Sequence, residues 1–359
     1  MAELADRVDL AVRGVRLEGE GSHDADAPVQ RRAGAGPTDD GHLVIGGRSA
    51  ALPIVSTSPY SLRGRRLLYE GTDMGLDVEP VRRPRFYDLR TADGVSYEQL
   101  ARLHGSDVLA TTVVQTCMRY DEATRCRFCA IEASLSAGST TAVKSPAQLA
   151  EVAEAAVRLD GVRQMVMTTG TSRGRDRGAT HLARCVAAVK AAVPALPVQV
   201  QCEPPAELSA IDALHAAGAT AIGIHVESLD DEVRRRWMPG KATVALAEYW
   251  AAWDRAVAVF GRNRVSTYLL VGLGEDPDEL VEGAGELIAR GVYPFVVPFR
   301  PMAGTLAKRD GAVAPSAELL ADVSGRVAEL LRRAGMFGVD QQAGCAACGA
   351  CGVLQAAGA

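Results

Sequence analysis

From about residue 107 onward, short runs of apolar residues alternate with longer stretches in which apolar residues recur every three to four positions. The short runs have the length of β-strands, and the longer stretches have the period of amphipathic α-helices. This alternation predicts successive βα units, in which helices cover a parallel sheet. The predicted strands are residues 108–114, 164–169, 198–202, 221–226, 265–271 and 293–297.

Local signals mark several helix boundaries. Ser145 followed by Pro146 is typical of an N-cap and the first helical residue, and Gly291 is typical of a helix stop. Six βα units are too few to close an eight-stranded barrel, but they suffice for a curved, partly open one. The pattern therefore predicts an α/β fold with a partial (β/α)6 barrel of the TIM type, whose reactive groups lie at the carboxyl ends of the strands.

The regions before and after this barrel differ from it in pattern. Short predicted strands at 42–45, 51–56 and 66–69 and a short predicted helix at 97–103 indicate a small β-rich cap. Gly, Pro and Asp residues around 20–40 predict a loosely ordered stretch. We therefore predict a cap region over 1–106, the barrel over 107–312, and a C-terminal helix with a cysteine-rich tail over 313–359.

Composition narrows the class of protein. Hydrophobic residues make up 48% and charged residues 23% of the 359 residues, as in ordinary globular proteins. The net charge of −5 and the scattered basic residues argue against nucleic acid as a partner. No apolar stretch is long enough to span a bilayer, and the first residues lack the pattern of a signal peptide, so we expect a cytoplasmic protein without a membrane partner.

The eight cysteines are unevenly distributed. Cys117, Cys126 and Cys129 fall in the loop after the first predicted strand, whereas Cys185 and Cys202 stand alone in apolar segments. In a reducing compartment such clustering favours metal ligands over disulfides. Three thiolates can hold a [4Fe-4S] cluster and leave one iron open for a small molecule.

Two other interpretations of the first cysteine group stay open at this point. A structural zinc site would use two cysteines separated by two residues as half of its ligands and would need two further ligands at a suitable distance. A non-enzymatic iron-sulfur electron carrier would use the same thiolates, but it would not need a barrel of this size.

The string Cys126-Arg-Phe128-Cys129 resembles the signature of the radical S-adenosylmethionine (radical SAM) superfamily, with an aromatic residue before the last cysteine. The usual spacing between the first two cysteines is three residues, and here it is eight. The resemblance implies a [4Fe-4S] cluster that binds and reductively cleaves S-adenosylmethionine. It further implies a 5′-deoxyadenosyl radical that takes hydrogen from a small-molecule substrate, and a reductant of the flavodoxin or ferredoxin type.

The same resemblance implies where the nucleotide binds. Residues at the predicted strand ends would meet the methionyl amine, the ribose, the methionyl carboxylate and the adenine, and a Pro-containing segment would close the site. For the acidic residues, a solvated carboxylate or a helix N-cap is an equally good interpretation. The implied residues are Phe128, Thr169, Gly170, Glu203, Glu227, Arg235, Gly272, Gly274 and Pro298.

Cys345, Cys348 and Cys351 have the close spacing of ferredoxin-type cluster loops, which predicts a second cluster. A fourth ferredoxin cysteine would fall at position 355, which is Gln. The fourth ligand could be Cys185 or Cys202, a non-cysteine residue or substrate. The last possibility resembles the auxiliary cluster of molybdenum-cofactor biosynthesis enzymes.

More narrowly, residues 86–89 and 103–105, the long cysteine spacing and the cysteine-rich tail resemble the radical SAM family found beside nitrilases in bacterial gene clusters. No acid/base pair stands out. His225, Arg119 and Tyr120 are candidates, and for His225 the lack of a partner pattern among the other histidines favours a role in the core. The sequence predicts neither the substrate nor the oligomeric state.

Overall fold

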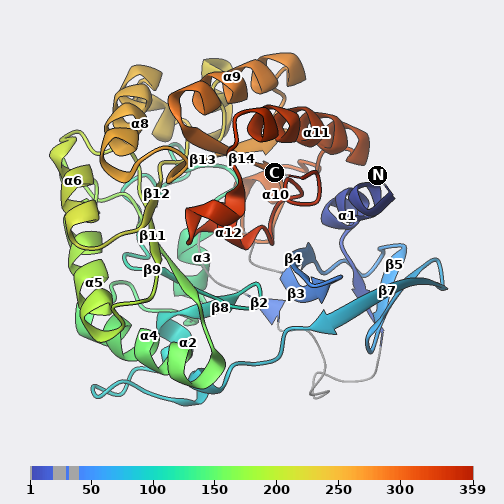
Figure 1. The fold of residues 1–359 in the computed structure, drawn as a ribbon, viewed down its shortest axis with the longest axis horizontal. Helices are drawn as coiled ribbons and strands as arrows, with labels where there is room; N and C mark the ends of the chain where they lie inside the picture. The colour runs from blue at the N-terminus through green and yellow to red at the C-terminus, as the bar shows by residue number, and fades with distance from the viewer. Residues whose placement is uncertain (1, 19–29, 32–39, 359) are drawn as a thin grey trace.

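In a computed structural model that describes residues 2–18, 30–31 and 40–358, the apolar runs of the second half of the chain form one seven-stranded sheet, in the order β14-β13-β12-β11-β10-β9-β8. Strands β9 to β14 pair in parallel, and β8 pairs antiparallel with β9. The sheet curls, with helices on its outer face (Figure 1), which confirms the predicted partial barrel. The strands are β8 (Arg102–His104), β9 (Val108–Thr112), β10 (Gln164–Thr168), β11 (Val198–Gln201), β12 (Ala221–Gly223), β13 (Val265–Val271) and β14 (Val292–Pro298).

The outer helices begin and end where the sequence signals them. The Ser145 side chain caps α4 and forms a capping box with Gln148, and Gly291 ends α9 in the left-handed conformation at φ +90°. The main outer helices are α4 (Pro146–Asp160), α5 (Ala179–Ala192), α6 (Ser209–Ala216), α8 (Leu246–Phe260), α9 (Pro277–Arg290) and α11 (Ala317–Arg333). Shorter elements are η1 (Arg85–Asp88), α2 (Tyr97–Leu100), α3 (Ile131–Ser136), α7 (Asp231–Trp237), η2 (Lys241–Thr243) and α10 (Leu306–Arg309).

Several predicted elements end earlier than expected, among them one helix and one barrel strand that do so by three residues. The helix predicted over 97–103 stops at Leu100, because residues 102–104 pair with β9 as strand β8. The strand predicted over 221–226 ends at Gly223. Beyond it the chain bends, and Glu227 adopts a left-handed conformation at φ +63°.

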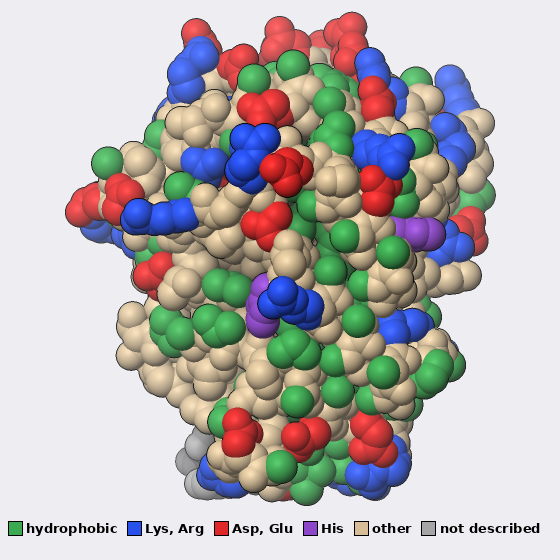
Figure 2. Space-filling model, turned by 90° about the vertical axis from the view of Figure 1, so that its left-hand side faces the viewer, with side chains coloured by type: hydrophobic (Ala, Val, Ile, Leu, Met, Phe, Trp, Pro, Cys, Tyr) green, Lys and Arg blue, Asp and Glu red, His purple; other side chains and the backbone are tan. Residues whose placement is uncertain are grey.

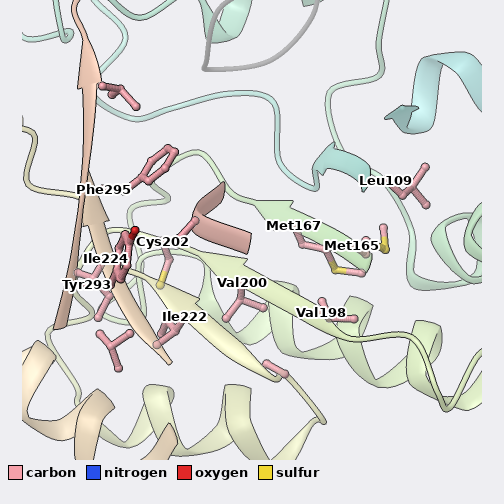
Figure 3. Close-up of a cluster of buried hydrophobic side chains, with 14 of the residues drawn as sticks. Leu109, Met165, Met167, Val198, Val200, Cys202, Ile222, Ile224, Tyr293 and Phe295 are labelled. Atoms are coloured by element: carbon pink, nitrogen blue, oxygen red, sulfur yellow. The ribbon is translucent and has the colours of Figure 1, made fainter. Parts of the chain in front are cut away.

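The barrel core is built from side chains of neighbouring strands. Met165, Met167, Val198, Val200 and Ile222 are all fully buried, and they lie beside one another along the sheet (Figure 3). Strands buried on both faces have near-continuous apolar sequences. This explains why the six parallel strands are readable from the sequence.

The N-terminal region forms a second, mixed sheet with its own core. Its strands follow the order β1-β5-β6-β7-β3-β2, with β4 paired to β3, and α1 (Ala2–Arg13) packs against β4 and α11. Helix α1 is not among the predicted elements, and the predicted loose stretch around 20–40 lies largely outside the described residues. The strands are β1 (Arg16–Leu17), β2 (Gln30–Arg31), β3 (Asp40–Ile45), β4 (Arg48–Pro53), β5 (Tyr60–Arg63), β6 (Arg66–Tyr69) and β7 (Thr72–Pro80).

The C-terminal tail folds back into the barrel through η3 (Gly338–Gln341) and α12 (Cys345–Cys348), and α12 lies inside the curl of the sheet (Figure 1). The amide of Gly344 donates to Gln164 Oε1 at 2.8 Å, and Arg264 Nη1 donates to Gln341 O at 2.9 Å. Gln164 and Arg264 lie at the amino ends of β10 and β13. The tail therefore covers the end of the barrel opposite to the one where reactive groups are expected.

The outer surface around α4, α5 and α6 carries acidic and basic side chains interspersed with one another (Figure 2). Mixed charge of this kind produces no extended field of one sign. Over the described ranges, no helix combines the length and the apolar character that a membrane crossing requires.

Candidate active site

The loop of residues 117–129 follows β9 and carries the first cysteine group. Hydrogen bonds tie its backbone to neighbouring strand ends and helices. The amide of Met118 donates to Thr171 O at 2.8 Å, and the amide of Arg127 donates to Trp237 O at 2.7 Å. The loop is thus fixed at the carboxyl ends of the parallel strands.

The thiols of Cys117, Cys126 and Cys129 line one cavity of about 340 Å³. The amide of Cys129 donates to Cys126 O at 3.0 Å, which forms a tight turn between these two cysteines. Burial raises the pKa of Cys126 and raises that of Cys129 to about 12. Because burial disfavours the charged form, these thiols need a cationic partner to become thiolates, and the iron of a cluster would supply one.

Glu203 holds this loop in place. Its carboxylate accepts from Arg119 Nη2 at 2.6 Å, from Arg119 Nε at 3.0 Å and from Thr171 Oγ1 at 2.8 Å. A second cation, Arg177, lies 3.4 Å from Glu203 Oε1. Because these partners engage both oxygens, the structure favours a role for Glu203 in anchoring the loop over direct contact with a nucleotide ribose.

Glu227 and Lys241 form a buried ion pair on the cavity wall. Burial disfavours the charge on Lys241, but the adjacent carboxylate of Glu227 outweighs this effect and raises the pKa of Lys241. The left-handed backbone at Glu227 is unusual for a residue other than glycine, and such strain clusters at functional sites. The pair places one negative and one positive group beside the cysteine loop.

Most of the predicted nucleotide-binding residues reach this cavity. Thr169 and Gly170 line it from the end of β10, and an added Cβ at Gly170 would lie 2.0 Å from Thr116 O. Glycine is therefore required where this strand end meets the cysteine loop. The predicted residues that line the cavity are Phe128, Thr169, Gly170, Glu203, Glu227 and Pro298.

Arg235, Gly272 and Gly274 do not line the cavity. Arg235 is exposed because α7 turns Val233 and Trp237 inward instead. Gly272 and Gly274 both have φ of +102°, and the amide of Gly272 donates to Glu275 Oε1 at 2.8 Å. The structure therefore places the two glycines in a turn before α9.

The second cysteine group lines the same cavity as the first. Cys345 Sγ accepts from Tyr268 Oη at 2.7 Å and from Gln201 Nε2 at 3.2 Å, and Cys351 Sγ lies 3.3 Å from His104 Nε2. The tail thus brings Cys345, Cys348 and Cys351 to face the loop of residues 117–129 across one enclosed space.

The two isolated cysteines are buried. Cys185 lies on α5 outside the cavity, with its sulfur 3.6 Å from His181 Nε2. Cys202 touches the cavity but packs within the barrel core (Figure 3). Burial raises the pKa of each thiol to about 12. These observations favour structural roles for both side chains.

Sequence reasoning missed several cavity residues with polar groups, among them Lys144, Lys241, Tyr268 and His104. Lys144 Nζ donates to Thr112 O at 2.6 Å, and burial lowers the pKa of this amine to about 7. Lys241, Tyr268 and His104 belong to no recognisable local motif, and their neighbours in the site are distant in sequence. For Lys144, the signal that could have been noticed is a lone lysine immediately before the Ser145 helix cap.

His225 lines the cavity and stacks on Tyr268 with ring centroids 4.1 Å apart. Its Nδ1 accepts from the Tyr268 amide at 3.2 Å, which requires the neutral ring. Burial and the nearby charge of Lys241 lower the pKa of His225 to about 3. His225 therefore stays neutral in the folded protein at physiological pH.

We expect the buried neutral ring of His225 to lower the free energy of unfolding as the pH drops. The unfolded chain binds a proton on this ring below about pH 6.5, whereas the folded protein binds it only near pH 3, so the loss begins as the pH drops below about 6.5. Its slope is about 1.4 kcal/mol per pH unit. Urea unfolding at pH 7 and pH 5 measures this slope. His225→Gln should reduce the slope. His215→Gln, at an exposed position of α6, should leave it unchanged. Equal slopes in all three proteins would contradict the assignment.

Among the described residues, no three His, Cys, Asp or Glu side chains are arranged to hold a single metal ion. The cysteines of both groups are distributed over the cavity wall, and none of the eight cysteines forms a disulfide in the part of the chain that the structure describes. Half-buried sulfur donors on different sides of a cavity suit an iron-sulfur cluster, which presents several irons to its ligands.

Residues 123–287 match the Radical SAM superfamily. This match covers a little under half of the chain and marks a radical SAM domain, which supports an enzyme of the radical SAM class. Bacteriochlorophyllide c C-7(1)-hydroxylase of Chlorobaculum limnaeum is 30% identical over 129 residues, which are 35% of this chain and 31% of that protein. The chain thus spans about a third of the length of this curated relative.

Solved structures of other proteins also match part of this chain. Methylornithine synthase (PylB) matches with 15% identity and a TM-score of 0.47, over 66% of this chain and 68% of that one. The FeFe-hydrogenase maturase HydG from Carboxydothermus hydrogenoformans matches with 16% identity and a TM-score of 0.46, over 64% and 52% of the two chains.

Proposed function

We propose that this chain reductively cleaves S-adenosylmethionine at a [4Fe-4S] cluster and abstracts hydrogen from a small-molecule substrate. The observation that carries the proposal is the convergence of Cys117, Cys126 and Cys129 on one cavity at the carboxyl ends of six parallel strands. When bound, the cluster supplies one electron to the sulfonium, whose bond to C5′ breaks to give methionine and a 5′-deoxyadenosyl radical.

The residues around the cavity have separate tasks in this proposal. Cys117, Cys126 and Cys129 hold the cluster, while Glu203 and Arg119 keep their loop in position. Glu227 and Lys241 offer a carboxylate for ribose hydroxyls and an ammonium group for the methionyl carboxylate. This assignment replaces Arg235, which lies outside the cavity.

Thr169, Gly170, Phe128 and Pro298 complete the wall against which the nucleotide would lie. Gly170 allows close backbone approach, and Phe128 joins an apolar cluster with Trp237 and others beside the cysteine loop. An apolar enclosure restricts access of water and of competing hydrogen donors to a reactive intermediate.

The C-terminal group adds a second cluster to the proposal. Cys345, Cys348 and Cys351 are half-buried and line the same cavity. Two side chains, Tyr268 and Gln201, donate hydrogen bonds to Cys345 Sγ. Hydrogen bonds to cluster sulfur are a common means of tuning the reduction potential. We propose that substrate lies between the two clusters.

The wider setting is also a proposal. A flavodoxin or ferredoxin would deliver the electron. The resemblance of residues 86–89 and 103–105 to the nitrilase-linked radical SAM family supports a place in a nitrilase-linked biosynthetic pathway. Eight cysteines without a disulfide suit a reducing compartment, which supports the cytoplasm as the location.

Anaerobically reconstituted protein with dithionite and S-adenosylmethionine tests the activity. We expect 5′-deoxyadenosine and methionine in equal amounts, and transfer of deuterium into 5′-deoxyadenosine from the correct labelled substrate. Bound iron with reversible redox but without 5′-deoxyadenosine would support an electron carrier instead. Colourless protein with bound zinc, lacking absorption near about 400 nm, would support a structural zinc site.

A further inference from the structure

His104 is placed beside the sulfurs of the second cysteine group. It is the last residue of β8, which pairs with β9 at the edge of the barrel sheet, and its ring lines the cavity. Its Nε2 lies 3.3 Å from Cys351 Sγ, although 247 positions separate the two residues in the sequence. The fold, not the local sequence, creates this proximity.

The backbone after His104 approaches a second sulfur of the group. Gly105 adopts a left-handed conformation at φ +58°, and an added Cβ there would lie 3.2 Å from Cys348 Sγ. The turn of residues 104–105 therefore meets both Cys348 and Cys351. Glycine at position 105 permits this turn and leaves room for the sulfur.

The third sulfur is addressed from the barrel wall. Tyr268 on β13 and Gln201 on β11 donate to Cys345 Sγ. Protein groups thus surround the three thiols from two directions, with hydrogen-bond donors on the barrel side and the ring of His104 on the β8 side. An imidazole is a metal ligand, whereas the Tyr268 and Gln201 groups that face Cys345 are donors.

The other candidates for a fourth ligand are placed less well. Cys185 lies outside the cavity, and Cys202 packs in the barrel core. Gln355 stands where a ferredoxin would have its fourth cysteine, but its Nε2 donates to Ala346 O at 2.8 Å and to Ala347 O at 3.2 Å. Gln355 therefore supports the backbone of α12.

We propose that His104 Nε2 is the fourth protein ligand of an iron-sulfur cluster held by Cys345, Cys348 and Cys351. This inference rests on the second cluster of the proposed function and adds its missing ligand. The neutral imidazole donates its Nε2 lone pair to the remaining iron, the three thiols each lose a proton, and no electron is exchanged. A fully protein-ligated cluster acts on substrate without binding it to iron.

The test uses the Cys126→Ala variant, in which the second cluster is the one expected to retain iron. The protein is prepared with natural histidine and with ¹⁵N-histidine, reconstituted, reduced and studied by pulsed electron paramagnetic resonance. We expect about four irons per chain and a strong histidine nitrogen coupling that changes with the isotope. His104→Ala in the same background should abolish this coupling, and His181→Ala, on α5 outside the cavity, should preserve it.

The outcomes separate the two proposals. About four irons with no strong nitrogen coupling, or with a coupling that survives His104→Ala, would overturn the ligand assignment and leave the second cluster standing. Folded protein without iron would overturn the second cluster together with its ligand, while 5′-deoxyadenosine formation by the unmodified chain would still support the first.

The variant His104→Cys distinguishes loss of the histidine ligand from loss of the cluster through misfolding. A thiolate at this position can bind the same iron, so we expect the iron content to be retained and the nitrogen coupling to disappear. The reduction potential should shift to a lower value, because replacing thiolate by imidazole raises the potential of such clusters. An unchanged potential in His104→Cys would count against direct ligation.

Discussion

Replacing Cys126 by alanine is expected to reduce 5′-deoxyadenosine formation to the rate measured without protein. Cys126 is half-buried at the tight turn with Cys129, and Cys117 lines the same cavity. Two thiolates hold a four-iron cluster poorly, so iron should fall from about eight to about four atoms per chain. Iron analysis and chromatography of the nucleoside product measure both effects.

Cys185→Ala is the matched control for this prediction. Cys185 is fully buried and lies on α5 outside the cavity, so its removal leaves only a small void in the core. We expect a loss of stability on the order of 1 kcal/mol with iron content and product formation maintained. Retained nucleoside formation in Cys126→Ala would refute the assignment of the cluster to this loop.

Replacing Gly170 by alanine is expected to displace the cysteine loop. The new Cβ would lie 2.0 Å from Thr116 O, next to Cys117, and this backbone atom cannot yield without moving its neighbours. Strain of this kind typically costs about 1–3 kcal/mol of unfolding free energy. We also expect a large loss of cluster iron and of product, because the thiols would no longer surround one space.

Gly325→Ala is the control for the effect of a methyl group alone. Gly325 lies within α11, and no atom lies within 4 Å of an added Cβ. Alanine is the better helix former there, so stability should rise by up to about 1 kcal/mol without change in iron content. Wild-type stability and iron binding in Gly170→Ala would show that the loop tolerates the shift.

The repetitive part of the fold could be predicted from the sequence because local rules and tertiary packing agree there. Buried parallel strands read as apolar runs, and Ser145 and Gly291 carry clear boundary signals. The helix predicted over 97–103 failed at its second half, where pairing of residues 102–104 with β9 outweighs helical periodicity. Non-local pairing of this kind leaves no trace in a short window.

In the candidate site, too, residues in a local motif could be predicted from the sequence, whereas residues that meet only through the fold could not. The spacing of Cys117, Cys126 and Cys129 identifies a loop, and this loop does surround a cavity. Arg235 lies outside this cavity, because three consecutive arginines look alike in the sequence until the phase of α7 turns Arg235 toward solvent. The contacts of Lys241 with Glu227 and of His104 with Cys351 depend on chain segments that meet only in the folded protein.

The docking of α12 has a consequence for biosynthesis. The tail touches the barrel through Gly344 and the N-terminal sheet through the 2.8 Å hydrogen bond from the Ala51 amide to Ala350 O. A ribosome releases both of these partners before it releases residues 345–351. The end of the barrel at the amino ends of its strands can therefore be covered only after the tail itself has been synthesised.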